Sequence, residues 1–490
     1  MIRSMSDILQ TVLQQNTQKF LSFEEFCSQC LPHFFSHQAA KYQKIIIQLI
    51  DTKNSSHLHK LNKYGQVYFH EGKEIKALID IEPRNFGKST RLSFAYPLYA
   101  LLTGKSKFTV LFAATENQAK KLMDDIRIEL EENEEIIRLF GPQRGPIWQS
   151  GFLKLSNGSA IAAKGSAQAI RGLKNRQYRP DLIICDDLLT DTSVYSQRSR
   201  DKVYSWLLRC VLPLGQEAFF ILVNTIFHSD DLPSRLLERV KNHQLPGWAA
   251  VHFSALLPSG KSLWPQYWPV EKLRKRRLEI GSYAFACEYQ NMPQDEEDRV
   301  FKASWIKTFT QEPHRDELQI FMGIDPSMGK KDSSAIVTLG RRNDGVIFVL
   351  DEWAEPCSPD SLIKKIIEKY LIFQPVKIAF EEVGFQAVYK NHILQESARQ
   401  GLYLPMVGIK PGRIGKTRIL SLSPLIENGL LLFRSKNSPL VTQILDYPHH
   451  IHDDLNDALY YAFSLIESHN EHAPIVVKTP AKHTVRNILK

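Results

Sequence analysis

The stretch that decides the fold of the first half of this 490-residue chain spans residues 77–90 and reads Ala77-Leu78-Ile79-Asp80-Ile81-Glu82-Pro83-Arg84-Asn85-Phe86-Gly87-Lys88-Ser89-Thr90. An apolar run of strand length leads into a loop whose end matches the G-K-[ST] part of a P-loop. A helical pattern follows from Thr90, so the motif stands in the strand, loop and helix context that it requires. The strict pattern has glycine where this chain has Glu82, and G-K-S alone is a weak signal.

Phosphate chemistry explains the residue types in this loop. Backbone N–H groups cradle phosphates, Lys88 supplies a cation to the β and γ oxygens, and the Ser89 hydroxyl ligates Mg²⁺. Arg84 could reach the γ-phosphate as a built-in arginine finger, or could be an ordinary surface arginine. The candidate nucleotide-binding residues are Arg84, Asn85, Phe86, Gly87, Lys88, Ser89 and Thr90.

A second apolar strand ends in two carboxylates, in the stretch Leu182-Ile183-Ile184-Cys185-Asp186-Asp187. Asp186 is expected to hold Mg²⁺ together with Ser89. Asp187 is expected to orient or deprotonate the attacking water, a task more often given to glutamate. The alternative is an acidic strand end that caps the next helix. The P-loop roughly 100 residues upstream favours the nucleotide interpretation.

Three arginines, Arg171, Arg176 and Arg179, precede this strand and could act across a subunit interface. The sequence does not choose among them.

The second half carries carboxylates of a different pattern. Asp325 and Glu381 each end a predicted strand, and Asp454 and Asp457 lie three apart near the start of the last helix. Acidic residues at a helix start are also favoured by its dipole, so the helix alone would indicate capping. Several carboxylates directed to one place repel one another unless cations sit between them. Their oxygen ligands favour Mg²⁺ or Mn²⁺, and two such ions support phosphodiester cleavage.

Two further acidic residues lie beside these candidates. Asp332 is a possible additional ligand. Glu382 is expected to point to the opposite side from Glu381 if the strand continues.

Composition sets the broad class. The apolar fraction of 43% and the charged fraction of 23% are those of a folded chain, and the net charge of +9 fits a polyanionic partner without proving one. Six scattered cysteines form no disulfide framework. Cys27 and Cys30 fall on one apolar helix face with Phe23 and Phe26, which favours a core helix over a zinc site. No signal peptide or membrane span is visible, so we expect a soluble intracellular protein.

The order of elements predicts an α/β protein. Strand-length apolar runs alternate with helical segments from residue 75 to about 255, which indicates a mainly parallel sheet covered by helices on both faces. A proline-rich and basic segment follows. Three strands in quick succession, from Ile320 to Leu350, then predict antiparallel pairing in a second domain.

Together these motifs resemble the large terminase subunit of tailed bacteriophages over roughly residues 35–467. The likeness also covers Asn224-Thr225-Ile226-Phe227-His228-Ser229-Asp230-Asp231-Leu232, which looks like the family's coupling motif, and Lys416-Thr417-Arg418-Ile419. The resemblance implies an N-terminal ASCE-type P-loop ATPase domain followed by an RNase H-like nuclease domain. The expected division is a helical region at 1–70, the ATPase at 71–255, a connecting subdomain at 256–315, the nuclease at 316–468 and a tail at 469–490.

The resemblance also implies roles and partners. Asp187 takes the place of the family's catalytic glutamate, and Asp325, Glu381 and Asp457, with Asp454, match its nuclease metal ligands. The implied cofactors are ATP and Mg²⁺, with Mn²⁺ possible in the nuclease. The implied partners are double-stranded DNA, a small terminase subunit and a portal ring, on which the chain assembles as a homo-oligomeric ring. The implied location is the host cytoplasm, transiently docked on the procapsid.

Two other functions stay open at this point. One is a helicase or recombination nuclease with the same two chemistries, although no further helicase motif follows Asp231. The other is a non-catalytic packaging scaffold from a decayed prophage, which Glu82 and Asp187 motivate.

Overall fold

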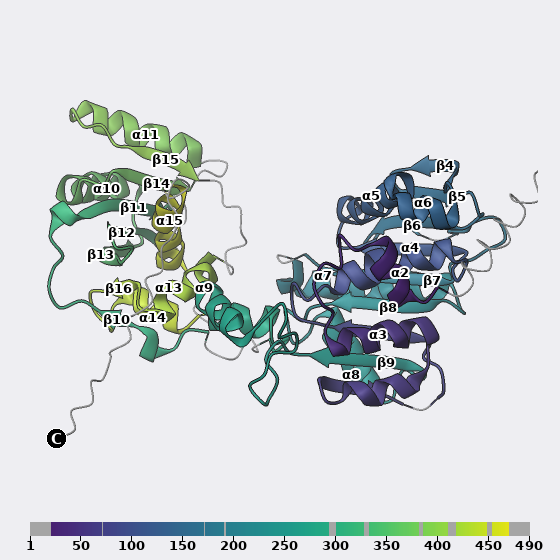
Figure 1. Ribbon diagram of the computed structural model, residues 1–490. Coiled ribbons are helices and arrows are strands. Elements are labelled where there is room, and N and C mark those ends of the chain that lie inside the picture. The colour runs from purple at the N-terminus through teal and green to yellow at the C-terminus, as the bar shows by residue number, and fades with distance from the viewer. Residues whose placement is uncertain are drawn as a thin grey trace, which may run out of the picture. The chain divides into compact units, whose positions relative to one another are not determined.

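The computed structural model in Figure 1 describes residues 21–70, 72–170, 172–190, 193–293, 300–327, 333–381, 386–409, 418–447 and 453–469. The chain divides into two compact units, unit 1 (Met1–Asp295) and unit 2 (Glu296–Lys490). Each unit is built around its own sheet.

Unit 1 contains a nine-stranded sheet in the order β1-β9-β2-β8-β7-β3-β6-β5-β4. The six strands from β9 to β6 in that order are parallel, and β1, β5 and β4 pair antiparallel at the two edges. The central strands are buried on both faces, which explains their continuous apolar runs. The strand bounds are β1 Gly65–Phe69, β2 Ala77–Ile81, β3 Phe108–Ala113, β4 Arg144–Gln149, β5 Phe152–Leu155, β6 Ala160–Gly165, β7 Leu182–Asp186, β8 Phe219–Asn224 and β9 Trp248–Phe253.

Helices cover both faces of this sheet. One face packs against α2 (Phe23–Cys30), α3 (Lys41–Thr52), the π-helical η2 (Thr90–Ala95) with α4 (Tyr96–Leu102), α5 (Glu116–Glu132) and α6 (Glu134–Phe140). The other packs against α7 (Gln197–Trp206), the π-helical η4 (Leu207–Val211) and α8 (Leu232–Lys241). Short 3-10 turns complete the unit at η1 (Ser55–Leu61), η3 (Ser193–Tyr195) and η5 (Leu212–Leu214).

The N-terminal helix α2 belongs to the core of unit 1. Ser22 and Glu25 form a capping box at its start. Cys27 and Cys30 are buried in the same apolar cluster, and burial raises the pKa of the Cys27 thiol well above its usual value. The core-helix interpretation of these cysteines is confirmed.

The segment after β9 returns to the P-loop. Trp268 stacks on Phe86, with ring planes 3° apart, and its indole N–H donates to the Asn85 carbonyl at 3.1 Å. Helix α9 (Val270–Glu288) then breaks at Gly281, where φ is +80°. Such a conformation suits glycine, and the break redirects the part of the helix that follows Gly281.

Unit 2 contains a seven-stranded sheet in the order β10-β16-β13-β12-β11-β14-β15. Strands β11, β12 and β13 form the predicted antiparallel succession, and β14 and β15 add in parallel next to β11. The strand bounds are β10 Lys307–Thr308, β11 Leu318–Asp325, β12 Ser334–Arg342, β13 Ile347–Glu355, β14 Lys377–Glu381, β15 Met406–Ile409 and β16 Leu431–Phe433.

Two helices cover one face of this sheet, α10 (Pro359–Phe373) and α11 (Gln386–Arg399). Helix α15 (Asp454–His469) lies against β11, β12 and β14. The remaining turns and helices are η6 (Ala303–Trp305), η7 (Arg315–Glu317), η8 (Ile419–Leu422), α13 (Ser423–Glu427) and α14 (Pro439–Leu445).

Gly323 in β11 lets α15 approach the sheet closely. A Cβ atom at this position would lie 2.1 Å from the Ala458 carbonyl oxygen and 2.4 Å from the Ala462 nitrogen. Side chains alternate along a strand, so Asp325 points to the same face as Gly323. The glycine therefore brings the start of α15 to the end of β11.

These topologies are the two predicted folds. In unit 1 one strand, β8, separates the P-loop strand β2 from the acidic-pair strand β7, which is the ASCE-type order. In unit 2 an antiparallel three-stranded meander is extended by parallel strands, as in RNase H-like domains. Among the described residues, no helix combines the length and apolar character needed to cross a membrane.

Candidate nucleotide and metal sites

The P-loop lies between β2 and η2, with its turn formed by residues in the left-handed region. Asn85 has φ of +62° and Gly87 of +76°. The Lys88 ammonium, only 6% exposed, donates to the Thr225 hydroxyl at 2.8 Å. Ser89 donates to an Asp186 carboxylate oxygen at 3.0 Å. The structure thus brings together Lys88, Ser89 and Asp186 from separate segments.

The acidic pair stands at the end of β7. Burial, and next the neighbouring Asp187 carboxylate, raise the pKa of Asp186 to about 7, while Lys88 opposes the shift. Asp187 has φ of +40°, and its carboxylate accepts from the Thr225 N–H at 3.4 Å. Burial and the neighbouring carboxylate therefore disfavour the ionised form of Asp186 unless a cation balances its charge.

A cavity of about 590 Å³ joins these groups. It is lined by Arg84, Lys88, Ser89, Ala113, Gln118, Lys121, Leu122, Asp125, Asp186, Asp187, Leu189, Thr190, Thr225 and Phe227. Cations from the loop face carboxylates from β7 across it. This donor set fits a phosphate chain with Mg²⁺, held by Lys88 and by Ser89 with Asp186.

Glu82 does not line this cavity. Its side chain is fully buried, pairs with the Arg91 guanidinium and accepts from the Tyr42 hydroxyl at 2.8 Å. Arg91 also donates to the Phe86 carbonyl at 2.9 Å. The residue that departs from the P-loop pattern therefore belongs to a buried network behind the loop, in which α3 and η2 hold the loop from outside.

Arg84 is tied to the end of α9. Its guanidinium donates to the Glu288 carboxylate at 2.8 Å, and its backbone N–H donates to the Glu288 carbonyl at 2.8 Å. The side chain is 44% exposed and also lines the phosphate cavity. Of the other arginines, Arg176 and Arg179 are exposed, and Arg171 lies outside the described residues.

The segment resembling the coupling motif runs from the phosphate cavity to α8. The Thr225 hydroxyl accepts from Lys88 and donates to the Glu82 carbonyl at 3.3 Å, whereas the Thr225 backbone N–H donates to Asp187. Asp231 caps α8 by accepting from the Ser234 N–H at 3.0 Å. The motif resemblance named this segment, but no sequence signal assigned Thr225 its contacts.

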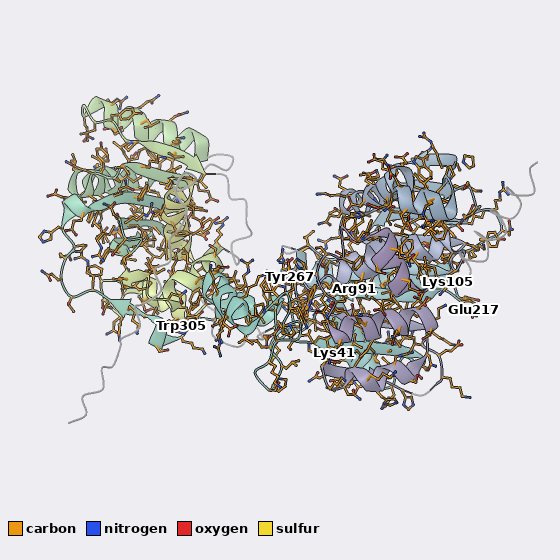
Figure 2. All side chains as sticks on the ribbon, viewed as in Figure 1. Lys41, Arg91, Lys105, Glu217, Tyr267 and Trp305 are labelled. Atoms are coloured by element: carbon orange, nitrogen blue, oxygen red, sulfur yellow. The ribbon has the colours of Figure 1, made fainter. Side chains whose placement is uncertain are left out.

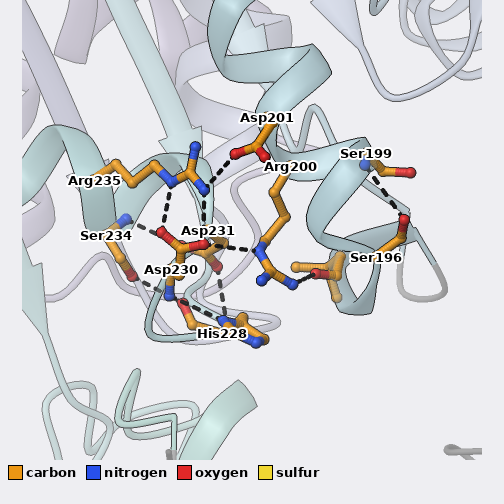
Figure 3. Close-up of polar contacts among 10 residues, drawn as sticks. Ser196, Ser199, Arg200, Asp201, His228, Asp230, Asp231, Ser234 and Arg235 are labelled. Carbon is orange, nitrogen blue, oxygen red and sulfur yellow. Dashed lines mark hydrogen bonds and ion pairs between the residues drawn. The ribbon is translucent and has the colours of Figure 1, made fainter. Parts of the chain in front are cut away.

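An ion-pair cluster at the end of this segment joins α7 to α8 (Figure 3). Arg235 donates to both Asp230 and Asp201 at 2.7 Å, and Arg200 donates to Asp230 at 3.3 Å. The Arg235 hydrogen bond lowers the pKa of Asp230, which favours the ionised pair. The two helices are therefore linked through the residues that follow Thr225.

The four carboxylates of unit 2 gather at one end of its sheet. Strands β11 and β14 are parallel with Ile324 opposite Phe380, so the residues that follow, Asp325 and Glu381, end side by side. Burial raises the pKa of Asp325 well above its usual value, and the charges of Asp457, Glu381 and Asp454 add to the shift. Burial likewise raises the pKa of Asp457 to about 7. The carboxylates predicted from strand and helix ends thus interact electrostatically.

Arg418 supplies a positive charge inside this carboxylate group. Its guanidinium donates to Asp457 and, at 2.7 Å, to the Tyr461 hydroxyl, and it lies 4.0 Å from Glu381. The side chain is 9% exposed. The arginine falls in a motif that the sequence singled out, but no sequence pattern assigned it a role.

The carboxylates fit a divalent cation in chemistry but not in their present arrangement. They form an oxygen-only donor set, as Mg²⁺ and Mn²⁺ prefer. Within the described ranges, however, no three Asp, Glu, His or Cys side chains stand grouped to hold a metal ion. The pair between Asp457 and Arg418 uses a carboxylate oxygen that a metal would need. Asp332 and Glu382 lie outside the described residues.

The folds and the two groups of side chains define a two-unit α/β protein with an ASCE-type P-loop unit and an RNase H-like unit. No protein-family model and no curated protein matches the chain.

Among solved structures, the chain is similar to large terminases of bacteriophages. It is 14% identical to the HK97 bacteriophage large terminase, covering 87% of this chain and 95% of that one with a TM-score of 0.36. It is 10% identical to the large terminase of a thermophilic bacteriophage in complex with ADP, covering 80% and 94% with a TM-score of 0.49. It is 17% identical to the large terminase nuclease of the thermophilic phage G20c with bound zinc, covering 33% and 95% with a TM-score of 0.26. These structures belong to the family that the motifs resemble.

Proposed function

We propose that this chain is the large subunit of a terminase, an ATP-driven motor that translocates double-stranded viral DNA into a procapsid and cleaves concatemeric DNA. The observation that carries the proposal is the convergence of Lys88 and Ser89 with Asp186 in one cavity. A phosphate-binding loop facing an acidic strand end is the arrangement that phosphoryl transfer needs, because that chemistry depends on positioning and charge. The carboxylate group of unit 2 adds the cutting chemistry.

In the ATPase, each role follows from position. Arg84 and Lys88 bind the phosphates, and Ser89 with Asp186 would hold Mg²⁺, which neutralises charge on the phosphates when bound. Asp187 orients the attacking water and accepts its proton. Thr225 contacts Lys88 and Asp187. Nucleotide binding at the phosphate site is therefore transmitted to α8 through the segment that begins at Thr225.

In the nuclease, Asp325, Glu381, Asp454 and Asp457 are the proposed ligands of Mg²⁺ or Mn²⁺. Two such ions, when bound, would supply the charge that activates water and stabilises the leaving oxygen of a phosphodiester. Arg418 pairs with Asp457, lies 4.0 Å from Glu381 and balances the charge of these two carboxylates in the absence of the ions.

The proposal extends to partners and organisation. The partners are double-stranded DNA, a small terminase subunit and a portal ring, on which copies of the chain form a ring in the host cytoplasm. A motor must bind any DNA sequence, which requires contacts to the phosphate backbone, so DNA affinity should fall steeply with salt.

The proposed division of the chain is a helical region at 1–70, the ATPase at 71–255, a connecting subdomain at 256–315, the nuclease at 316–468 and a tail at 469–490.

The test separates the two activities. Lys88→Ala should abolish DNA-stimulated release of phosphate from ATP while leaving DNA cleavage in Mg²⁺ or Mn²⁺ intact. Asp325→Asn should abolish cleavage of plasmid DNA and leave ATP turnover intact.

The matched controls are Lys241→Ala and Asp316→Asn, which remove the same charges from exposed positions. Turnover of ATP by Lys88→Ala, or cleavage by Asp325→Asn in a nuclease-free preparation, contradicts the corresponding half of the proposal. Unwinding of a tailed duplex would instead indicate a helicase.

A further inference from the structure

The end of helix α9 contacts two of the segments that line the phosphate cavity. Glu288 accepts two hydrogen bonds from Arg84, one from the guanidinium to its carboxylate and one from the backbone N–H to its carbonyl, each 2.8 Å long. Three residues later, the Asn291 side chain accepts from the Ile226 N–H at 3.0 Å, directly after Thr225. Arg84 and Thr225 both line the cavity. One short stretch of chain is therefore bonded to the P-loop and to the segment after β8.

This stretch is anchored in the core of unit 1. Tyr289 is fully buried, and its ring stacks on Phe285 with centroids 5.2 Å apart and planes 6° apart. The buried Asn291 side chain donates to the Phe253 carbonyl at 2.8 Å. A supporting residue positions its partner precisely when packing fixes its own backbone. Glu288 meets this condition, because the chain is anchored before and after it.

The main chain of the P-loop is fixed as well. Arg91, labelled in Figure 2, donates to the Phe86 carbonyl at 2.9 Å, and the Trp268 indole donates to the Asn85 carbonyl at 3.1 Å. These bonds do not determine the direction of the Arg84 guanidinium, which is partly exposed and stands at the end of a long side chain. The orientation of this cation requires a contact of its own.

The Glu288 carboxylate supplies that contact. A guanidinium carries five N–H donors in a planar fork, so one can stay on a carboxylate while others face a phosphate. A guanidinium that is already oriented loses less side-chain freedom when its ligand arrives. Glu288 is not among the described residues that line the cavity, so its influence on a bound nucleotide passes through Arg84.

We propose that Glu288 is a positioning residue of the ATPase, which holds the Arg84 guanidinium toward the γ-phosphate of ATP. The proposal rests on the proposed function, because it requires ATP on Lys88 and Ser89. It deepens that function by giving the arginine of the P-loop a partner outside the loop, at the end of α9.

The experiment compares Glu288→Ala, Arg84→Ala and the double variant in the full chain. Calorimetric titrations in Mg²⁺ use ADP and a non-hydrolysable ATP analogue with an imido bridge between the β and γ phosphorus atoms. Glu288→Ala should weaken binding of the analogue by about tenfold and leave ADP binding unchanged, because only the analogue has a γ-phosphate. It should also lower the kcat of phosphate release by about 10–10²-fold, as a misplaced catalytic group does.

Two comparisons separate positioning from a structural role. In the Arg84→Ala background, Glu288→Ala should change neither quantity further, because the two side chains act as a unit. Glu288→Gln keeps an acceptor oxygen for the guanidinium and should recover most of the lost turnover. The matched control is Glu271→Ala, which removes an exposed acid from the first turn of the same helix.

Three results in Glu288→Ala overturn the positioning role. Normal turnover with normal analogue binding shows that the carboxylate is not needed, and leaves the P-loop site standing. Equal weakening of ADP and analogue binding shows that Glu288 supports the loop as a whole. Tighter analogue binding or faster turnover shows that the carboxylate competes with the phosphate for Arg84.

The remaining outcomes concern the other variants and the wild type. A further loss in the double variant, beyond that of Arg84→Ala, overturns the proposal because Glu288 would then act apart from Arg84. Wild-type behaviour of Arg84→Ala overturns it as well, together with the phosphate contact assigned to Arg84. Failure of the wild-type chain to bind either ADP or the analogue counts against the proposed function itself.

Discussion

The Ser89 hydroxyl and the Asp186 carboxylate lie 3.0 Å apart although 97 positions separate them in the chain. Their contact joins the loop after β2 to the end of β7, two strands that are not neighbours in the sheet. Both groups are hard oxygen donors, the type that Mg²⁺ prefers.

Asp186→Asn should therefore lower ATP turnover by on the order of 10²–10³-fold, as when one preorganised electrostatic partner is removed. Ser89→Ala should act in the same direction. The measurement is steady-state release of phosphate across a Mg²⁺ titration, with Glu217→Gln, at an exposed position, as the control. Wild-type turnover in Asp186→Asn would contradict the role assigned to this pair.

The buried pair of Glu82 and Arg91 predicts strongly non-additive stability. Arg91→Met alone leaves a buried, unpaired Glu82 and should cost about 3–5 kcal/mol of the free energy of unfolding. Adding Glu82→Gln should restore much of that loss, since the uncompensated charge is removed. Urea denaturation followed by tryptophan fluorescence measures both variants. Glu82→Gln alone completes the cycle, and a loss in the double variant equal to the sum of the two single losses would show that the two side chains do not interact.

Asp80 predicts a pH dependence of stability. Burial raises its pKa well above the usual value, with the neighbouring Glu82 adding to the shift. The folded chain then keeps a proton that the unfolded chain loses above a pKa of about 3.9. The stability that the proton on Asp80 contributes therefore falls as the pH rises from about 3.9 toward the folded-state pKa. Asp80→Asn should flatten this fall and raise stability at pH 7, while Glu217→Gln, at an exposed carboxylate, should leave it unchanged. Denaturation curves from pH 4 to pH 8 decide the matter.

Gly323 predicts a steric defect in unit 2. Gly323→Ala places a Cβ atom 2.1 Å from the Ala458 carbonyl oxygen, which belongs to helix backbone and cannot move alone. The substitution should cost about 1–3 kcal/mol of stability and move α15, with Asp457, away from Asp325. The comparison is Ala458→Gly, which removes a methyl group at the same helix–strand contact instead of adding one. Gly345→Ala would not serve as a control, because the positive φ of +91° at Gly345 would itself strain an alanine. Thermal unfolding and DNA cleavage are the readouts, and unchanged values for both would contradict the close packing.

Arg418 predicts competition with divalent cations. Its guanidinium pairs with Asp457 and lies 4.0 Å from Glu381, so an arriving cation must displace it. Arg418→Gln should tighten Mn²⁺ binding by about tenfold or more, since a unit charge about 4 Å away opposes a cation by ~1 kcal/mol in water and by ~4 kcal/mol near a protein surface. Arg399→Gln, on the exposed side of α11, is the control. Calorimetric titration with Mn²⁺ measures the affinity without relying on cleavage, and weaker binding by Arg418→Gln would mean that the arginine supports the metal site instead.

The strand-end carboxylates were predictable from the sequence because parallel strands present their carboxyl ends at one sheet edge. This reasoning correctly placed Asp186 at the end of β7, and Asp325 and Glu381 at the ends of β11 and β14. The assignment of these residues to nucleotide and metal stays a proposal. The three-strand meander followed from three apolar runs in quick succession, and the core position of Cys27 followed from helical periodicity.

Other parts of the sites depend on contacts that no local pattern encodes. Thr225 meets Lys88 across 137 positions, and Arg84 meets Glu288 across 204. Strand β1 falls in a region expected to be helical, because its half-exposed residues form a strand only by pairing with β9. Tertiary context overrides local preference in such cases.

The placement of Glu82 has a consequence for finding related chains. Since Glu82 does not line the phosphate cavity and pairs with Arg91 nine positions later, the acid and the base form one structural unit. A search that insists on glycine at the start of the loop passes over any chain built this way. A pattern that accepts an acid there, provided that a base stands nine residues downstream, should recover homologues in which both residues change together or not at all.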